Sequence, residues 1–430
     1  MMQGRLNMFQ CAMLRWRGLH PYCASHVITI KKPLDEARLR ETIASVLRDC
    51  GLTGLALDAK RQRFEYRGGP ASVSLLVSDG ADAPFEAAAK VIERTINEPF
   101  PSDEGYDPFR FFAVRAGEND FLLGLTYDHF IAGGDSIVVL VTDLADRYVA
   151  QSGDHSLPRL ERYPPTYSRL FARHAGALLR GLAALRGLLA GWRSAIRPHF
   201  KDPSDGYNGF VHALVDPARH ATLRSAAQRF GVTSNDLLLA LVLRGVMPIA
   251  ACRHHSGRRN QVALASIVNV RGDYQPPATR VFGQFLSSFR IVHPFDEHRS
   301  LADIAVAISR QTGRAKREKL YLVTLVAMAA AAISWASASP ARRHRLYIKY
   351  HPVFAGLTPL NVDALRRSRA MQPPDYLRAA STGPMSPLVV ATTVSGAALR
   401  LGVTFRTTAL SRDDAQAVLQ SILTNIDTLS

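Results

Sequence analysis

Cysteine is scarce in this chain. The 430 residues contain four cysteines, Cys11, Cys23, Cys50 and Cys252, and no C-x-x-C pair. This spacing excludes a zinc ribbon and does not fit the disulfide framework of a small secreted protein. The first twenty residues also lack the uninterrupted apolar core of a signal peptide, because Arg5, Arg15 and Arg17 interrupt it. We therefore expect buried free thiols and a cytoplasmic protein.

Several common catalytic signatures are also missing. The sequence contains no G-x-x-x-x-G-K-[ST], no G-x-S-x-G and no H-E-x-x-H. Their absence removes the usual P-loop nucleotide, serine-hydrolase and zinc-protease interpretations. His254 and His255 lie in a charged segment typical of an exposed loop, so we expect no metal site there.

Acidic residues are outnumbered by basic ones. The 36 Asp and Glu residues face 53 Lys and Arg residues, which gives a formal net charge of +17. This charge favours an anionic partner, such as nucleic acid, an anionic membrane, an acidic protein or a phosphorylated cofactor. Arginine clusters at 342–345 and 366–369 lack interleaved aromatic residues, so nucleic acid is the least favoured partner.

Alternating strand and helix patterns predict an α/β architecture. Predicted strands cover 25–32, 71–77, 107–116, 121–126, 210–216, 261–271 and 398–408, and predicted helices cover 34–47, 86–96, 221–231, 233–246 and 410–426. Ser411 and Asp414 fit the capping positions of the last helix. Together with the length, the pattern predicts two large lobes, at 1–163 and 207–430, joined by a region at 164–206.

The joining region reads as a long basic amphipathic helix over 168–200. Its apolar face would carry Leu170, Phe171, Leu178, Leu182, Leu185, Leu189, Trp192 and Ile196. Such a helix can contact an anionic membrane or a carrier protein, and it can equally cross between lobes with a solvated arginine face. A second apolar segment, 320–337, is alanine-rich, and we predict a core helix rather than a membrane span.

His129 stands at an unusual junction. An apolar strand ends at Asp128 and His129, and Gly133, Gly134, Asp135 and Ser136 then lead into a second apolar run. Glycines followed by a helix start can hold a histidine rigidly at the mouth of a cleft. A neutral imidazole there could accept a proton from a hydroxyl or an amine. A histidine at a strand end can equally have a purely structural role.

The segment DHFIAGGDS at 128–136 resembles the His-His-x-x-x-Asp-Gly signature of the chloramphenicol acetyltransferase-like superfamily. That superfamily includes condensation domains of nonribosomal peptide synthetases, plant-type acyltransferases and wax ester synthases. The resemblance extends in order through the segments NEPFP, GVTSNDLLLALVL, VNVRGDY, VFGQFLSSF, FAGLTPLNV and LRLGVTFRTTALSRDDAQAVL. It implies two similar chloramphenicol acetyltransferase-like lobes with mixed sheets flanked by helices, and an active-site tunnel at the lobe interface with His129 as general base.

Two positions depart from the family signature. Asp128 stands where the family has its first histidine, and Gly133 stands where it has an aspartate that pairs with a downstream arginine. Arg271 matches that arginine. We hypothesise that Asp135 supplies the missing carboxylate and pairs with Arg271, while Gly134 and Ser136 support the loop.

Loop hydroxyls and amides are candidates for stabilising the oxyanion of a thioester under attack. They are Ser287, Thr358, Asn361 and Thr382. Each of these residue types is more often a cap or a turn residue than a catalytic group.

The resemblance implies a stand-alone condensation-type acyltransferase. It would move an acyl group from a CoA or carrier-protein thioester, the co-substrate, to a hydroxyl or amine acceptor, without a bound cofactor or metal. Its acidic partners would be acyl-CoA or an acyl or peptidyl carrier protein, with a peripheral membrane contact left open. The alternative is a non-catalytic member that binds a carrier protein or an acyl chain.

Overall fold

The computed structural model describes residues 2–80, 82–101, 106–150, 167–183, 191, 193–251, 258–275, 278, 281–296, 298–366 and 372–429. Every structural statement below concerns these residues. Cys252, His254, His255 and several positions of the predicted joining helix, including Leu185, Leu189 and Trp192, lie outside them.

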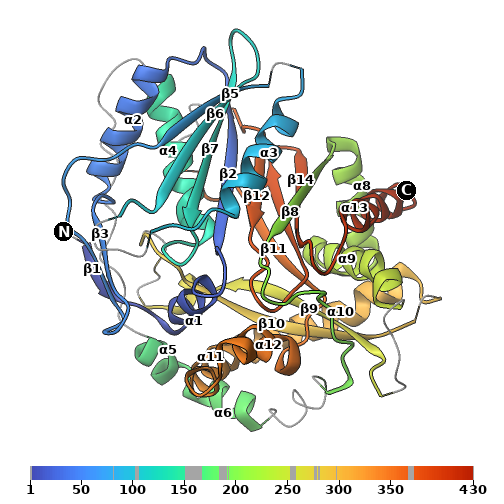
Figure 1. The fold of residues 1–430 in the computed structure, drawn as a ribbon. Helices are drawn as coiled ribbons and strands as arrows, with labels where there is room; N and C mark the ends of the chain where they lie inside the picture. Colours follow the sequence, from blue (N-terminus) through green and yellow to red (C-terminus); the bar gives the residue numbers. More distant parts are fainter. Residues whose placement is uncertain are drawn as a thin grey trace.

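The first lobe is built on a five-stranded mixed sheet with strand order β12-β2-β7-β6-β5. Its strands are β2 (Cys23–Ile30), β5 (Leu75–Asp79), β6 (Phe109–Arg115), β7 (Phe121–Asp128) and β12 (Tyr376–Ala380). Helix α4 (Gly134–Val149) packs on β2 and against α2 (Glu36–Asp49), while α3 (Pro84–Ile96) packs on β2, β6 and β7. Figure 1 shows α3 on the other side of this sheet from α2 and α4.

The second lobe is built on a six-stranded mixed sheet with order β10-β9-β11-β13-β14-β8. Its strands are β8 (Asn208–Val215), β9 (Gln261–Asn269), β10 (Leu286–Pro294), β11 (Ala355–Asn361), β13 (Leu388–Ser395) and β14 (Ala398–Arg406). Its helices are α8 (Pro217–Arg229), α9 (Ser234–Ala251), α10 (Leu301–Arg317), α11 (Tyr321–Ala336), α12 (Pro340–Tyr350) and α13 (Arg412–Asp427). The predicted capping box of α13, between Ser411 and Asp414, is confirmed.

A small sheet stands at the edge of the first lobe. It has the order β1-β4-β3, from strands β1 (Met2–Arg5), β3 (Leu55–Asp58) and β4 (Arg63–Tyr66). Helix α1 (Met8–Arg17) follows β1 and packs on α11 of the second lobe (Figure 1). The α/β class with mixed sheets flanked by helices, predicted from the sequence, is confirmed.

Strand β12 joins the two lobes. By sequence it belongs to the half predicted as the second lobe (207–430), yet it pairs antiparallel with β2 of the first lobe, with Arg378 opposite His26. It reaches β2 by crossing close to β14. At the crossing, a Cβ atom on Gly402 would stand 1.9 Å from the backbone oxygen of Arg378, so glycine is required there.

The joining region differs from its prediction. The expected continuous helix is divided into α5 (Tyr167–Arg173) and α6 (Ala175–Ala183), and residues 196–200 are not helical. Leu170 is buried as expected, but Leu182 is 39% exposed. For the described residues, the prediction of one continuous amphipathic helix is therefore wrong, because the spacing of apolar residues does not encode where a helix is interrupted.

Among the described residues, α9 is the one single helix long and apolar enough to span a membrane, and 67% of it is buried. α10 and α11 reach that length and apolarity only as a pair, and they are bent by 77° at the break between them. The first turns of α11, the segment predicted as a core helix, are buried, whereas Ile333 near its end is 76% exposed.

The crossing at Gly402 gives a direct test of how β12 is held. Gly402→Ala should lower the free energy of unfolding by at least about 1–3 kcal/mol, because the new methyl group must displace backbone rather than a flexible side chain. Chemical denaturation measures this. The matched control is Gly356→Ala on β11, where the added Cβ meets Val389 at an ordinary 3.5 Å and the change should stay within about 0.5 kcal/mol. An equal loss of unfolding free energy in Gly402→Ala and Gly356→Ala would contradict the close contact between β12 and β14 at Gly402.

Candidate active site

The end of β7 fixes the position of His129. All eight residues of β7 are buried, and the backbone N–H of His129 donates to the carbonyl of Tyr22 at 3.1 Å. The imidazole lies between two aromatic rings, with centroid distances of 5.4 Å to Tyr22 and 5.7 Å to Tyr127. The ring is therefore held on both sides just beyond the strand.

His129 lines a cavity of about 100 Å³ between the lobes. Tyr22, His26 and Tyr127 line it from the first lobe, and Leu286 and Thr358 line it from the second. Burial lowers the pKa of His129 to about 4. A backbone hydrogen bond with Ala132 raises this pKa slightly, and the charge of Arg378 lowers it slightly. The imidazole is thus neutral at pH 7, which is the form a general base needs.

Asp128 does not line this cavity. Its carboxylate pairs with Arg17 Nε of α1 at 2.9 Å and accepts a hydrogen bond from Tyr106 Oη at 3.1 Å. Burial raises the pKa of Asp128 to about 6, against the opposing effect of Arg17. Successive strand residues point to opposite faces, so the aspartate at the first position of the signature ties α1 to the end of β7.

Gln284 braces the loop that follows His129. Its side-chain Nε2 donates to the carbonyls of His129 at 3.0 Å and Ala132 at 3.2 Å. A Cβ atom on Gly133 would stand 2.8 Å from Gln284 Oε1. The long amide therefore occupies the space beside the position where the family signature has its aspartate. Sequence reasoning quoted the segment FGQF but did not assign this role to Gln284.

Asp135 lies near Arg271, as hypothesised, but the contact is long. Arg271 Nε and Asp135 Oδ2 are 3.8 Å apart, and Asn269 Nδ2 donates a closer hydrogen bond to the same carboxylate oxygen. Arg271 Nη2 instead donates to Ser136 Oγ at 2.6 Å and to the carbonyl of Gly283 at 2.9 Å. The serine hydroxyl, which had only a supporting part in the prediction, makes the direct contact.

Arg378 is a buried cation at the wall of the cavity. Its Nη2 donates to the carbonyl of Thr358 at 2.6 Å, and its Nε donates to Thr393 Oγ1 at 2.9 Å. Its Nη1 lies 3.0 Å from the place that a Cβ on Gly134 would occupy, so Gly134 lets the guanidinium approach the start of α4. Sequence reasoning missed Arg378, because nothing in its local pattern reveals that β12 joins β2.

The four oxyanion candidates divide into two groups. Thr358 and Thr382 line the cavity. The hydroxyl of Thr382, however, already donates a hydrogen bond to Asn208 Oδ1 at 2.9 Å. Ser287 faces away and donates to the carbonyl of Tyr321 at 2.6 Å, and its neighbour Ser288 lines the cavity instead. Asn361 is exposed and caps a turn by accepting from the Ala364 N–H at 3.2 Å. Ser287 and Asn361 were therefore wrong choices for groups that face His129.

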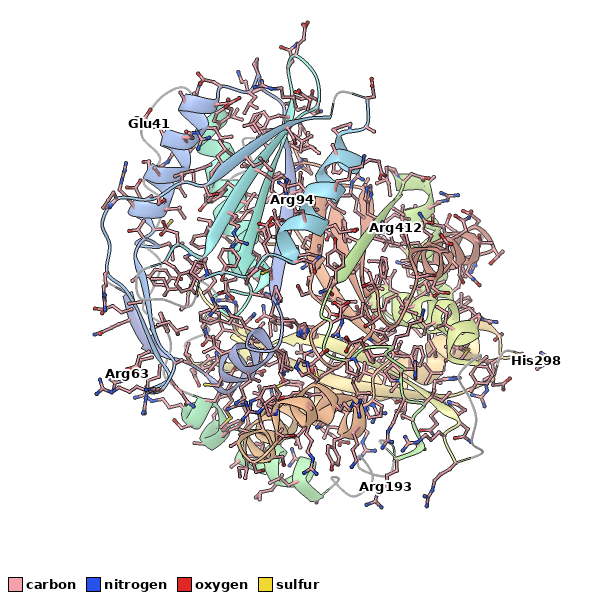
Figure 2. The ribbon with its side chains drawn as sticks, in the orientation of Figure 1. Glu41, Arg63, Arg94, Arg193, His298 and Arg412 are labelled. Atoms are coloured by element: carbon pink, nitrogen blue, oxygen red, sulfur yellow. The ribbon has the colours of Figure 1, made fainter. Side chains whose placement is uncertain are left out.

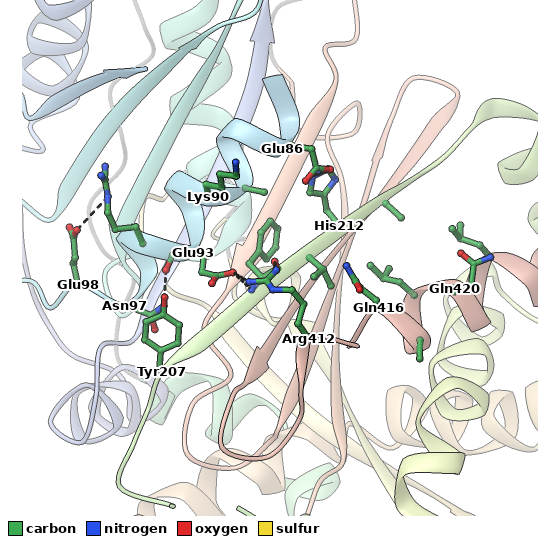
Figure 3. Close-up of a pocket in the computed structure, with 18 residues that line it drawn as sticks. Glu86, Lys90, Glu93, Asn97, Glu98, Tyr207, His212, Arg412, Gln416 and Gln420 are labelled. Carbon is green, nitrogen blue, oxygen red and sulfur yellow. Dashed lines mark hydrogen bonds and ion pairs between the residues drawn. The ribbon is translucent and has the colours of Figure 1, made fainter. Parts of the chain in front are cut away.

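A larger groove of about 1070 Å³ lies between α3, β8 and α13 (Figure 3). His129 does not line it. Arg412 Nη2 pairs with Glu93 Oε2 at 2.6 Å, and His212 Nε2 lies 3.2 Å from Glu86 Oε1. These contacts link α3 to the second lobe, so this groove is part of the lobe contact rather than the site. No cluster of potential metal ligands occurs among the described residues.

Because Gly133 and Gln284 share one space, we expect a substitution at one position to compensate for the loss of activity caused by a substitution at the other. Gly133→Asp alone should lower kcat at least about tenfold, because its Cβ collides with Gln284 and disturbs the His129 loop. Adding Gln284→Asn shortens the amide and should recover part of that loss, so the effects should be non-additive. The transfer assay described below measures all four variants of the cycle. If the effects of the two substitutions on kcat were strictly additive, Gly133 and Gln284 would not act together in holding the His129 loop.

No family model matches the chain, and neither does any curated protein. Solved structures do match it over nearly its whole length. The first condensation domain of the CDA synthetase is 16% identical, with 99% of this chain and 96% of that one covered and a TM-score of 0.69. SgcC5 from Streptomyces globisporus is 14% identical, with coverage of 99% and 98% and a TM-score of 0.66.

A third match is the starter condensation domain of rhizomide synthetase, solved in complex with C8-CoA. It is 13% identical, with 100% of this chain and 94% of that one covered and a TM-score of 0.66. At these identities the likeness establishes the fold. The chain has the two-lobed fold of these condensation domains.

Proposed function

We propose that this protein is a condensation-type acyltransferase that moves an acyl group from a CoA or carrier-protein thioester to a hydroxyl or amine. The observation that carries the proposal is the neutral imidazole of His129 in a cavity lined by both lobes. The base accepts the proton of the acceptor as its oxygen or nitrogen attacks the thioester carbonyl. The C–S bond then breaks, and the departing thiolate takes up the proton from His129 and leaves as the thiol, so no covalent acyl-enzyme is required.

Arg378 is our candidate for stabilising the negative charge that develops on the carbonyl oxygen. It is buried and lines the same cavity as His129. Burial lowers its pKa, but an arginine remains charged at neutral pH. A fixed cation in a cavity of low polarity stabilises an oxyanion more strongly than water does.

The proposed acyl donors are anionic, which fits the positive net charge of the protein. CoA and phosphopantetheine carry phosphates, and carrier proteins present acidic surfaces. A net charge of +17 attracts either donor. Long basic side chains such as Arg63 and Arg193 extend from the periphery of the molecule (Figure 2).

Replacing His129 tests the proposal most simply. Purified protein is incubated with a panel of acyl-CoAs and acyl-carrier proteins and with hydroxyl and amine acceptors, and products are followed by mass spectrometry. His129→Ala should lower kcat by about 10²- to 10⁴-fold, because the proton acceptor is lost. His298→Ala, at an exposed histidine far from the cavity (Figure 2), should retain full activity.

Two outcomes would contradict the proposal. Wild-type rates in His129→Ala would exclude the general-base role. Binding of acyl thioesters without turnover across the whole panel would favour the non-catalytic alternative.

The pKa of His129 predicts the acid limb of the pH profile. Because burial lowers this pKa to about 4, the basic form is fully present at neutral pH and is lost when the pH falls through about 4. kcat/KM should therefore stay level from pH 7 to about pH 5. An acid limb near the ordinary histidine value of about 6.5 would show that the catalytic base is not this buried imidazole.

A further inference from the structure

A second cavity, of about 220 Å³, opens beside the His129 cavity, and we call it the distal chamber. Both cavities are lined by Ala265, Ser288, Met328, Val353 and Met385. The walls of the distal chamber come from β9, β10, α10, α11 and α12 of the second lobe. The two cavities therefore adjoin and share part of their walls.

One face of β10 runs along both cavities. Leu286 and Ser288 line the His129 cavity, while Ser288 and Arg290 line the distal chamber. Alternate strand residues share a face, and four residues of antiparallel strand span about 13 Å. Leu286 lies beside the His129 loop, because its Cγ is 3.7 Å from the Cβ position of Gly133. Arg290 thus lies at one end of a row of β10 residues whose other end, Leu286, lies beside the His129 loop.

Arg290 carries a positive charge that the described part of the chain leaves uncompensated. Its Nε and Nη1 are buried without a hydrogen-bond partner, and its Nη2 has one long contact, 3.5 Å to the carbonyl of Gly191. Burial lowers its pKa to about 9, so it stays protonated at pH 7. Buried charges in proteins are normally paired, and a bidentate carboxylate is the usual partner of a guanidinium.

The other titratable groups of the chamber do not supply that partner. Arg314 is exposed and already paired with Glu318 at 3.1 Å. Burial, together with the charge of Arg290, lowers the pKa of His351 to about 4, so its imidazole is neutral at pH 7. Among the described residues, no aspartate or glutamate lines the chamber. The charge of Arg290 is therefore available to a ligand.

Most of the remaining lining of the chamber is apolar, with Ser288, Gln311, Thr324 and Tyr347 as further polar side chains. Its lining includes Leu320, Val323, Ala327, Met328, Ala331 and Val353. Such walls favour a hydrocarbon body, and a few placed polar groups fix its orientation. The distal chamber thus combines largely apolar walls with the guanidinium of Arg290.

We propose that the distal chamber binds the carboxylate end of a substrate whose apolar body extends from the His129 cavity, through an ion pair with Arg290. The inference rests on the proposed function, because the other end of that substrate reacts at His129. The carboxylate belongs either to the acyl group or to the acceptor. The chemistry recognised is the same in both cases.

Matched probes separate these two sources. Octanoyl-CoA is compared with the mono-CoA thioester of octanedioic acid, and octanol with ω-hydroxyoctanoate. Affinities are measured by isothermal titration calorimetry on the full chain carrying His129→Ala, so that turnover does not consume the probe. The carboxylate member of one pair should bind about 10- to 100-fold more tightly than its partner, which is the ordinary strength of a hydrogen-bonded charge pair.

Substitutions at Arg290 assign the preference to that residue. Arg290→Met should abolish it and tighten binding of the probe that lacks the terminal carboxylate, because the side chain becomes apolar. Arg290→Lys should keep part of it, since a point charge replaces the fork. Arg314→Met, which removes the exposed and paired arginine beside the same chamber, should leave the preference intact. Thermal melts confirm that each variant is folded.

Two results would overturn the inference: equal affinity within both probe pairs, or a carboxylate preference that survives Arg290→Met. Its failure is distinguishable from failure of the proposed function. Acyl transfer without any carboxylate preference removes this inference alone. An Arg290-dependent preference without transfer in the wild-type protein removes the proposed activity alone.

Discussion

The pairing of β12 with β2 is the constraint on which the site depends. The strand leaves the second lobe, crosses β14 at Gly402 and completes the sheet of the first lobe. Because backbone hydrogen bonds hold β12 in register, the lobes cannot separate without breaking a sheet. The same register places Arg378 opposite His26, so the buried cation and the His129 cavity are brought together by one strand.

Around His129 the chain differs from the family signature at two positions, and other side chains hold the loop. Asp128 reaches away to Arg17, and the brace of the loop passes to Gln284 and Ser136. Gly133 leaves room for the longer glutamine amide. A departure from a motif is therefore not by itself evidence of lost function, because a neighbouring residue can supply the same support from another element.

Local patterns in the sequence predicted much of the fold. Alternation of apolar residues predicted β2, apolar runs predicted β7 and β9, and the capping residues at Ser411 and Asp414 predicted the start of α13. These signals are local, since a strand or helix end is encoded by residues within a few positions of it. The order of the motif segments added the superfamily fold, which the solved structures support.

What remained hidden depends on contacts between distant segments. Arg378 and Gln284 are separated from His129 by more than a hundred positions, and neither has a local pattern that reveals its place. Ser287 was chosen over Ser288 because the register of β10 relative to the cavity decides which of the two faces it. The prediction of one long joining helix failed for a similar reason, because the local spacing of apolar residues does not encode where a helix is interrupted.

Intact-protein mass spectrometry under single-turnover conditions tests the central claim most directly, which is that one cavity between the lobes carries the acyl group straight from thioester to acceptor. The enzyme is mixed in excess with an acyl thioester and an acceptor, quenched at short times and weighed. The account predicts that the thioester disappears as product forms while the protein mass stays unchanged. A protein that gains the mass of the acyl group before product appears would contradict direct transfer with His129 as base.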